Sequence, residues 1–144
     1  MTDIGHKIIW DSEEVALASI GESPHEWEAT GISIDSRTLK TGDIFFAITD
    51  VRDGHEFIED AFTKGAAVAV VSSEPKNNLT GKPLLVVENV FKALNDFAKL
   101  ARARTKATVI AVTGSAGKTS TKNILAFCLK KFGRVYESEK SYNN

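Results

Sequence analysis

The stretch T-V-I-A-V-T-G-S-A-G-K-T-S-T-K, residues 108–122, decides the fold expected of this chain. Residues 108–112 are apolar and largely β-branched, which predicts a strand that is buried on both faces. A glycine-rich loop occupies residues 113–119, and apolar residues at helical spacing over residues 121–132 predict an amphipathic helix closed by Gly133. A strand that enters such a loop and a helix that leaves it are the context required of a phosphate-binding loop.

The loop departs from the standard phosphate-loop pattern, because Val112 occupies the position of the first glycine. Its glycines would let backbone N–H groups surround phosphate oxygens. Lys118 would reach the terminal phosphates, and the Thr119 hydroxyl would ligate magnesium. The alternative is a glycine turn with an incidental lysine, and the Ser120 hydroxyl is as well explained by a bond to a helix carbonyl. The residues assigned to phosphate binding are Thr113, Gly114, Ser115, Ala116, Gly117, Lys118, Thr119 and Ser120.

Upstream of the loop, strand-like and helix-like patterns alternate. Apolar runs predict strands at residues 8–10, 30–34, 43–47, 66–71 and 84–87, with one more beginning at 134–136. Asp11 and Asp53, each followed three residues later by a glutamate, predict two helix N-caps. The first helix should end near Ile20, and a third amphipathic helix is predicted over residues 90–101. This alternation predicts an α/β protein with a largely parallel sheet in its second part, and a domain boundary at about residues 104–107.

The composition is that of a soluble globular protein, with 42% hydrophobic and 26% charged residues. A formal net charge of -1 gives no general attraction to nucleic acid. No apolar run approaches the roughly 20 residues that span a bilayer, and no secretory signal is recognisable, so we expect a cytoplasmic protein without membrane insertion. The single cysteine, Cys128, is expected in the core. His6, His25 and His55 lie in unrelated segments, which argues against a metal site built from histidines.

Four blocks of sequence together resemble the Mur ligase family of cell-wall synthesis. The glycine loop, residues 113–119, has the family's shortened T-G-x-x-G-K-T form. Upstream stand Asp35-Ser36-Arg37, T-G-D-I-F-F-A over residues 41–47, and Asp53-Gly54-His55, which are similar to blocks of the family's N-terminal domain. The resemblance implies a small α/β UDP-sugar-binding domain over residues 1–105. It also implies that residues 106–144 hold the first strand, loop and helix of a phosphate-loop ATPase domain.

The resemblance assigns roles to individual residues. Ser36 and Arg37 would contact the UDP-linked sugar, whereas the residues alone suggest a polar turn with a solvated arginine. Asp53 would cap a helix, bind the ligand, or do both. Lys118 and Thr119 would be catalytic, with Thr119 on Mg²⁺. The other implied substrate-binding residues are Gly54, His55, Asn143 and Asn144.

Within the family, the resemblance is closest to the branch that joins D-alanyl-D-alanine to UDP-MurNAc-tripeptide. It rests on Ser115, Thr121-Lys122 and residues 140–144, K-S-Y-N-N. The implied reaction uses ATP and Mg²⁺ to phosphorylate the peptide carboxylate, which the dipeptide amine then attacks. The alternatives are the branch that adds the third peptide residue, an inactive UDP-sugar-binding module, and an unrelated phosphate-loop NTPase or kinase. The resemblance also implies a monomer when full-length, with small-molecule substrates and no nucleic-acid partner.

The family's central domain needs more parallel strands than this chain contains, and only Glu137 and Glu139 follow the loop as acidic groups for magnesium. We therefore expect an engineered piece, a truncated gene product or a portion of a larger enzyme. Alone, the chain should not ligate and should bind ATP weakly at best. The strand at residues 108–112 would lack most of its neighbours, and an apolar helix face would be left exposed.

Overall fold

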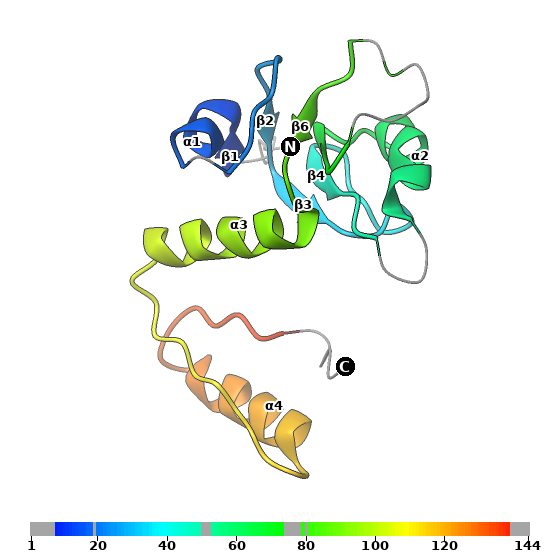
Figure 1. Cartoon of the computed structure of the whole chain (residues 1–144). Helices are drawn as coiled ribbons and strands as arrows, with labels where there is room; N and C mark the ends of the chain where they lie inside the picture. Colours follow the sequence, from blue (N-terminus) through cyan, green and yellow to red (C-terminus); the bar gives the residue numbers. More distant parts are fainter. Residues whose placement is uncertain (1–7, 19, 50–52, 74–78, 80, 139–144) are drawn as a thin grey trace, which may run out of the picture. The chain divides into compact units, whose positions relative to one another are not determined.

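The computed structural model describes residues 8–18, 20–49, 53–73, 79 and 81–138. The chain divides into two units, Met1–Thr105 and Lys106–Asn144, whose helices and strands are labelled in Figure 1. The units are joined through the residues that follow the last helix of the first unit.

A four-stranded parallel sheet forms the centre of the first unit. Its strand order follows the sequence: β3 (Gly31–Ser33), β4 (Asp43–Phe46), β5 (Val68–Val71) and β6 (Leu84–Val86). All residues of β4 and β5 are buried, as expected of strands that are covered on both faces. The α/β class and these four strands are confirmed, but the parallel sheet lies in the first unit and not in the second part of the chain.

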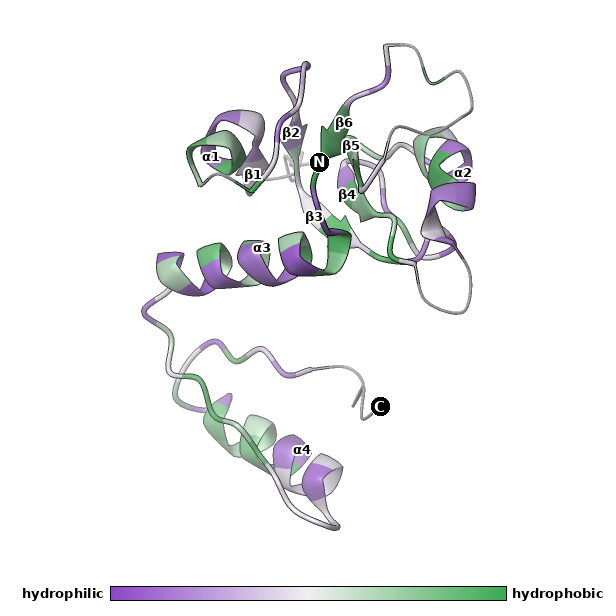
Figure 2. Ribbon diagram, viewed as in Figure 1, coloured by the Kyte–Doolittle hydropathy of each residue, from purple (hydrophilic) through white to green (hydrophobic). Residues whose placement is uncertain are grey.

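Two apolar layers cover the sheet because successive strand residues point to opposite faces. On one face, Phe45 and Ala69 pack with residues of the short helix α2 (Ile58–Thr63). On the other, Phe46 and Val70 join a cluster that includes Phe97 of the long helix α3 (Val90–Arg104). Figure 2 shows apolar strands inside this unit and alternating polar and apolar bands along α3, as an amphipathic helix requires.

The helix ends of the first unit follow local capping chemistry. Asp11 caps α1 (Ser12–Leu17) by accepting a 2.8 Å hydrogen bond from the Glu14 amide, as predicted. The helix ends at Leu17, before the predicted end near Ile20. Asp53 begins a 3-10 helix, η1 (Gly54–Phe57), and α2 continues from it. Asn89 caps α3 by accepting from the Lys92 amide, which the sequence analysis did not identify.

A small antiparallel sheet was not predicted. It pairs β1 (Trp10–Asp11) with β2 (Glu28–Ala29), so the strand expected at residues 8–10 is displaced toward Asp11. Trp10 is 4% exposed and packs against Phe97 at 4.7 Å between ring centroids. The pairing closes one end of the larger apolar cluster, in which Trp27 is also buried.

The second unit contains α4 (Lys118–Leu129) as its only helix or strand among residues 106–138. The strands predicted at residues 108–112 and 134–136 are wrong, because no described segment provides either of them with a hydrogen-bonded partner. The prediction that Cys128 is buried is also wrong, since the residue is exposed. In the described part of this unit only Ala126 is buried. Its exposed large apolar side chains are Val109, Ile110, Ile124, Phe127, Phe132 and Tyr136.

Candidate functional site

The glycine loop leads directly into α4. Gly117 is the N-cap residue, with φ 73° and ψ 1°, a left-handed conformation that strongly favours glycine. Because a glycine cap has no side chain, no side-chain hydrogen bond satisfies the first amides of α4. The helix begins at Lys118, so the positive end of its dipole lies at the loop.

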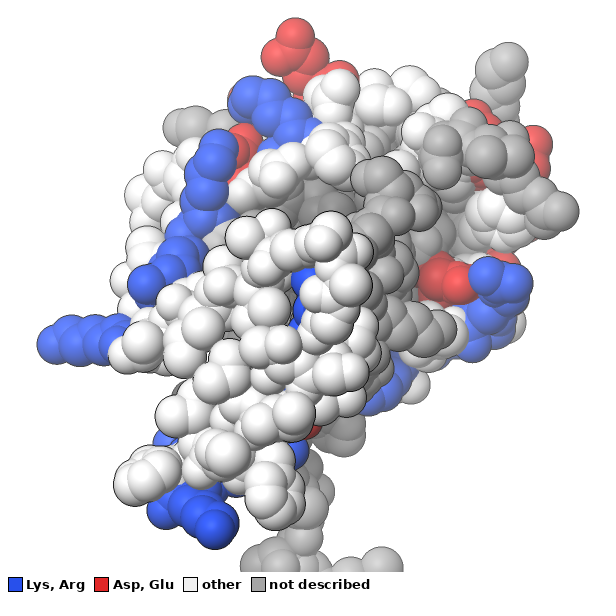
Figure 3. Space-filling model, turned by 90° about the horizontal axis from the view of Figure 1, so that it is seen from below, with Lys and Arg blue, Asp and Glu red and all other residues white. Residues whose placement is uncertain are grey.

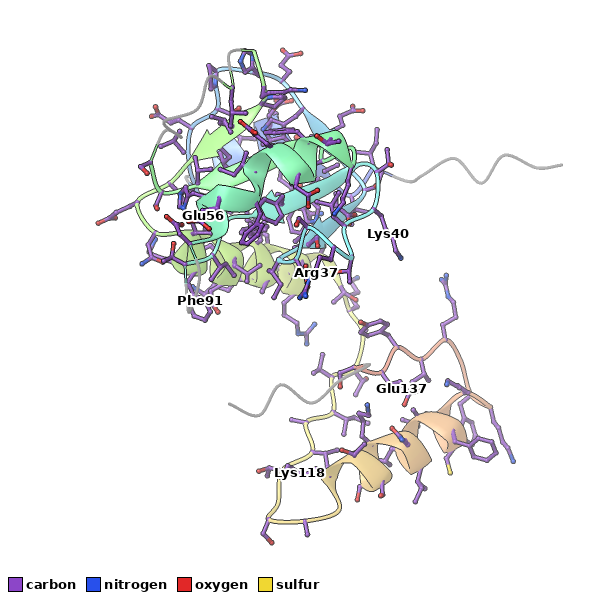
Figure 4. The ribbon with its side chains drawn as sticks, turned by 90° about the vertical axis from the view of Figure 1, so that its right-hand side faces the viewer. Arg37, Lys40, Glu56, Phe91, Lys118 and Glu137 are labelled. Carbon is purple, nitrogen blue, oxygen red and sulfur yellow. The ribbon has the colours of Figure 1, made fainter. Side chains whose placement is uncertain are left out.

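Lys118 folds back over the loop, and its Nζ donates a 2.7 Å hydrogen bond to the Gly114 carbonyl (Figure 4). One helical turn later, the Nζ of Lys122 donates to the Ser138 carbonyl. Both lysines and Thr119 line a cavity of about 260 Å³, together with residues 110–112 and Ser138. No acidic side chain is among the described residues that line it. This arrangement favours an anion with several oxygen atoms, such as a polyphosphate.

The remaining loop positions are accessible to a ligand. The exposed positions are Thr113, Gly114, Ser115, Ala116, Gly117, Thr119 and Ser120. Asn143 and Asn144, which the family resemblance places among the substrate contacts, lie outside the described residues. Within the described part of the chain, no three His, Cys, Asp or Glu side chains gather to hold a metal ion. None of the described helices has the length and apolar character needed to cross a bilayer.

The Asp35-Ser36-Arg37 block follows β3 and is organised by one ion pair. Arg37 donates to the Asp35 carboxylate from Nε at 2.9 Å and from its terminal nitrogen at 2.7 Å. The guanidinium lowers the pKa of Asp35 to about 2, mainly by these hydrogen bonds. Ser36 is buried, and its carbonyl accepts a 3.0 Å hydrogen bond from Lys64 Nζ. The Arg37 side chain is 84% exposed, so it is accessible to an anionic ligand while it is paired.

The Asp53-Gly54-His55 block forms a second polar group. The Oδ1 atom of Asp53 accepts from the His55 amide at 3.1 Å, from His55 Nδ1 at 2.7 Å and from Thr49 Oγ1 at 2.9 Å. These bonds, led by the backbone and side-chain bonds from His55, lower the pKa of Asp53 to about 2. On the other side of the ring, His55 Nε2 accepts from the Ser72 amide at 3.2 Å.

Gly54 is required by close packing. A Cβ atom at this position would lie 2.4 Å from the Ile48 carbonyl oxygen and 2.6 Å from the Ala47 carbonyl carbon. The Gly54 amide also donates to that Ile48 carbonyl at 3.1 Å. A larger residue would push the 3-10 helix away from the end of β4, so glycine here holds the polar group against the sheet.

The depressed pKa of Asp53 predicts a pH effect on stability. An aspartate with a folded pKa of about 2 stabilises the fold above the unfolded value of about 3.9, and this contribution is lost as pH falls from about 4 to about 2. Asp53→Asn should therefore lower the urea midpoint at neutral pH and make its decline across that acid range shallower. The other paired carboxylates also have lowered pKa values, so part of the decline in the urea midpoint should remain in the variant. An unchanged acid slope would contradict the assignment.

The structure brings together some of the predicted site residues and separates others. Asp53 and His55 meet Thr49 and Ser72, which follow β4 and β5 and which the sequence analysis missed. The sequence pattern that could have identified them is that each is the first hydroxyl-bearing residue after a buried strand. Arg37 lies elsewhere on the same unit, away from Glu56 of η1 in Figure 4. Figure 3 shows both acidic and basic side chains on the face turned toward the viewer.

A cavity of about 210 Å³ lies at the ends of three strands of the sheet. Thr49 and Ser72 line it together with Ala47, Ile48, Glu88, Asn89, Val90 and Phe91. These residues follow β4, β5 and β6, so the cavity is at the carboxyl edge of the parallel sheet. That edge is the usual ligand-binding side of open α/β sheets.

Comparisons with known proteins agree on one family. A family model described as "Mur ligase family, catalytic domain" matches residues 28–119. A UDP-N-acetylmuramoyl-tripeptide--D-alanyl-D-alanine ligase of Rickettsia prowazekii is 37% identical over 137 residues, which cover 95% of this chain and 30% of the relative. A UDP-N-acetylmuramoyl-L-alanyl-D-glutamate--2,6-diaminopimelate ligase of Rickettsia bellii is 38% identical over 96 residues, 67% of this chain and 19% of that protein.

Solved structures give the same result. The D-alanyl-D-alanyl ligase structure from Acinetobacter baumannii matches 85% of this chain and 28% of its own, with a TM-score of 0.71 and 30% identity. A Thermotoga maritima MurF ligase in complex with ADP matches 69% of this chain and 23% of its own, with a TM-score of 0.58 and 33% identity. The chain thus spans about a third or less of the length of the relatives it matches.

Proposed function

Because this chain belongs to the Mur ligase family, we propose that it forms part of an ATP-dependent ligase of peptidoglycan synthesis that joins D-alanyl-D-alanine to UDP-MurNAc-tripeptide. The observation that carries the proposal is the glycine loop at the start of α4, where Lys118 and Thr119 line one cavity. Similarity to a relative named for this reaction extends over 95% of the chain.

Under this proposal, each of the two units would bind a different ligand. Residues 1–105 would hold the UDP-linked sugar, with Ser36, Arg37 and the Asp53-Gly54-His55 block at or near the ligand. Residues 106–144 would begin the ATP-binding domain. The buried core and the polar carboxyl edge of the sheet support the first role, and the loop-helix geometry supports the second.

In the reaction, the terminal phosphoryl group of ATP would pass to the peptide carboxylate, and the dipeptide amine would then displace phosphate to form the amide bond. Lys118 would exchange its bond with the Gly114 carbonyl for a phosphate oxygen and offset the charge on the transferred group. The amides of the first turn of α4 would orient the phosphates. Since a threonine hydroxyl is an oxygen donor of the kind Mg²⁺ accepts, Thr119 fits this ion, which would neutralise charge on the phosphates.

A second candidate function has a specific observation in its favour. The Rickettsia bellii relative, named for ligation of 2,6-diaminopimelate, is as similar over its matched region as the dipeptide-adding relative. The two functions differ in both substrates. The diaminopimelate-adding function uses the carboxylate of a UDP-MurNAc-dipeptide and the amine of diaminopimelate. The dipeptide-adding function uses the carboxylate of a UDP-MurNAc-tripeptide and the amine of D-alanyl-D-alanine. The amine that supports turnover therefore discriminates between them.

The test is a substrate-dependence assay on the protein encoded by the longest open reading frame that contains this sequence. With ATP and magnesium, phosphate release should require both UDP-MurNAc-tripeptide and D-alanyl-D-alanine. Release that instead requires UDP-MurNAc-dipeptide and diaminopimelate would favour the second function, and release with neither pair would contradict both. The 144-residue chain itself should release no phosphate in the same assay, because so much of the length of its relatives lies outside it.

A further inference from the structure

The His55 ring is fixed by the protein on both sides. Its Nδ1 lies 2.7 Å from Asp53 Oδ1, and its Nε2 accepts a 3.2 Å hydrogen bond from the Ser72 amide. The side chain is only 15% exposed. The ring thus joins η1 to the residue that follows β5, across 17 positions of sequence.

The hydrogen-bond partners determine the tautomer of His55. A backbone N–H can only donate, so Nε2 must carry a lone pair where it meets Ser72. The single ring proton is then on Nδ1, which donates to the Asp53 carboxylate. Both nitrogens are occupied in this arrangement, which leaves the ring neither a free donor nor a free acceptor for a ligand.

The contacts of His55 extend to two walls of the cavity at the carboxyl edge of the sheet. Through Asp53, which also accepts from Thr49 Oγ1, the ring restrains the segment that follows β4. Through the Ser72 amide it restrains the segment that follows β5. Thr49 and Ser72 are hydroxyl-bearing residues of the cavity lining, so the geometry of this lining depends on His55.

The chemistry of the cavity indicates which part of a ligand it would receive. No lysine or arginine is among its described lining residues, and Glu88 adds a carboxylate. A diphosphate would be repelled there, whereas hydroxyl and amide groups could hydrogen bond with Thr49, Ser72 and Glu88. Asn89 uses its side-chain oxygen to cap α3, which leaves its amide N–H groups as donors.

We propose that His55 is a positioning residue that sets the spacing of Thr49 and Ser72, so that their cavity receives an uncharged, hydroxyl- or amide-bearing part of the UDP-linked sugar. This inference rests on the proposed role of residues 1–105 in binding that ligand. His55 acts through the two neighbouring segments and does not touch the ligand.

The test compares three substitutions in the 144-residue chain. In His55→Asn the side-chain amide can still donate to Asp53 but cannot reach Ser72. In His55→Gln the longer side chain offers an oxygen to the Ser72 amide but loses the Asp53 bond. His55→Ala removes both, and His25→Gln, at an exposed histidine outside this group, is the matched control.

Two readouts are measured for each variant: hydrogen exchange of the Ser72 amide by NMR, and affinity for UDP-MurNAc-tripeptide by calorimetry. Exchange should accelerate in the Asn and Ala variants and remain near wild type in the Gln variant and the control. Affinity should fall roughly tenfold or more in His55→Ala, with Gln closer to wild type than Ala, because the alanine variant holds neither the Thr49 nor the Ser72 segment in place. Nitrogen NMR of the wild-type ring should show the Nδ1–H tautomer.

The outcomes separate this inference from the proposed function. If the wild-type chain does not bind UDP-MurNAc-tripeptide, the proposed role of residues 1–105 fails, and this inference fails with it. If the wild type binds but all three variants lose affinity equally while Ser72 exchange is unchanged, His55 contacts the ligand directly and the positioning role is wrong. An Nε2–H tautomer in the free chain would also overturn it.

Discussion

If the proposed ligase function is correct, replacing Lys118 with alanine in the longest protein that contains this chain should lower kcat by about 10²–10³-fold, the usual effect of removing a group that stabilises charge in the transition state. Lys118 is the first residue of α4 and already spans the loop to the Gly114 carbonyl. From that position its ammonium group can follow the phosphoryl group during transfer. Turnover is measured as phosphate release that depends on both peptide substrates.

We do not expect the loss of turnover in Lys118→Ala to arise from unfolding. A lysine at a helix N-terminus interacts unfavourably with the helix dipole, and alanine has the higher helix propensity, so Lys118→Ala should not weaken α4. The matched control is Lys130→Ala, which removes a lysine paired with Glu137 at the other end of the helix. Turnover near wild type in the Lys118 variant, or an equal loss in the Lys130 control, would contradict the assignment of the loop.

Replacing Phe97 with alanine should lower the free energy of unfolding of the first unit by about 3–5 kcal/mol, the range for a large aromatic removed from a packed core. Phe97 is fully buried on the inner face of α3. Its ring lies 4.7 Å from the Trp10 ring and 5.3 Å from the Phe46 ring between centroids. The truncation would leave a cavity and would remove the contacts that α3 makes through this ring with both the sheet and the β1–β2 pair.

The measurement is urea unfolding of the chain followed by tryptophan fluorescence, because Trp10 contacts the altered position. Phe91→Ala is the matched control, since Phe91 lies on the same helix but is 63% exposed. A surface truncation of this kind usually changes stability by no more than about 0.5 kcal/mol. Similar shifts in the two variants would show that Phe97 is not part of the central packing.

The candidate site could be anticipated from the sequence only in part. The loop residues around Lys118 form a contiguous motif, so their proximity to the start of α4 required no knowledge of the remaining fold. The partners of His55 could not be found in this way. Ser72 approaches the ring because β4 and β5 are neighbours in the sheet, and that pairing is a property of the strand order.

Features set by neighbouring residues were determined by the sequence itself. The Asp11 cap, the positions of the four strands along the chain and the helix that follows the glycine loop each depend on short-range patterns of polarity, branching and backbone freedom. The tertiary structure decided what depends on distant partners. Residues 108–112 have strand-like composition but form no strand, because a strand needs a second segment to complete its hydrogen bonds. Cys128 is exposed for the related reason that burial requires an opposing surface, which the described part of the second unit does not provide.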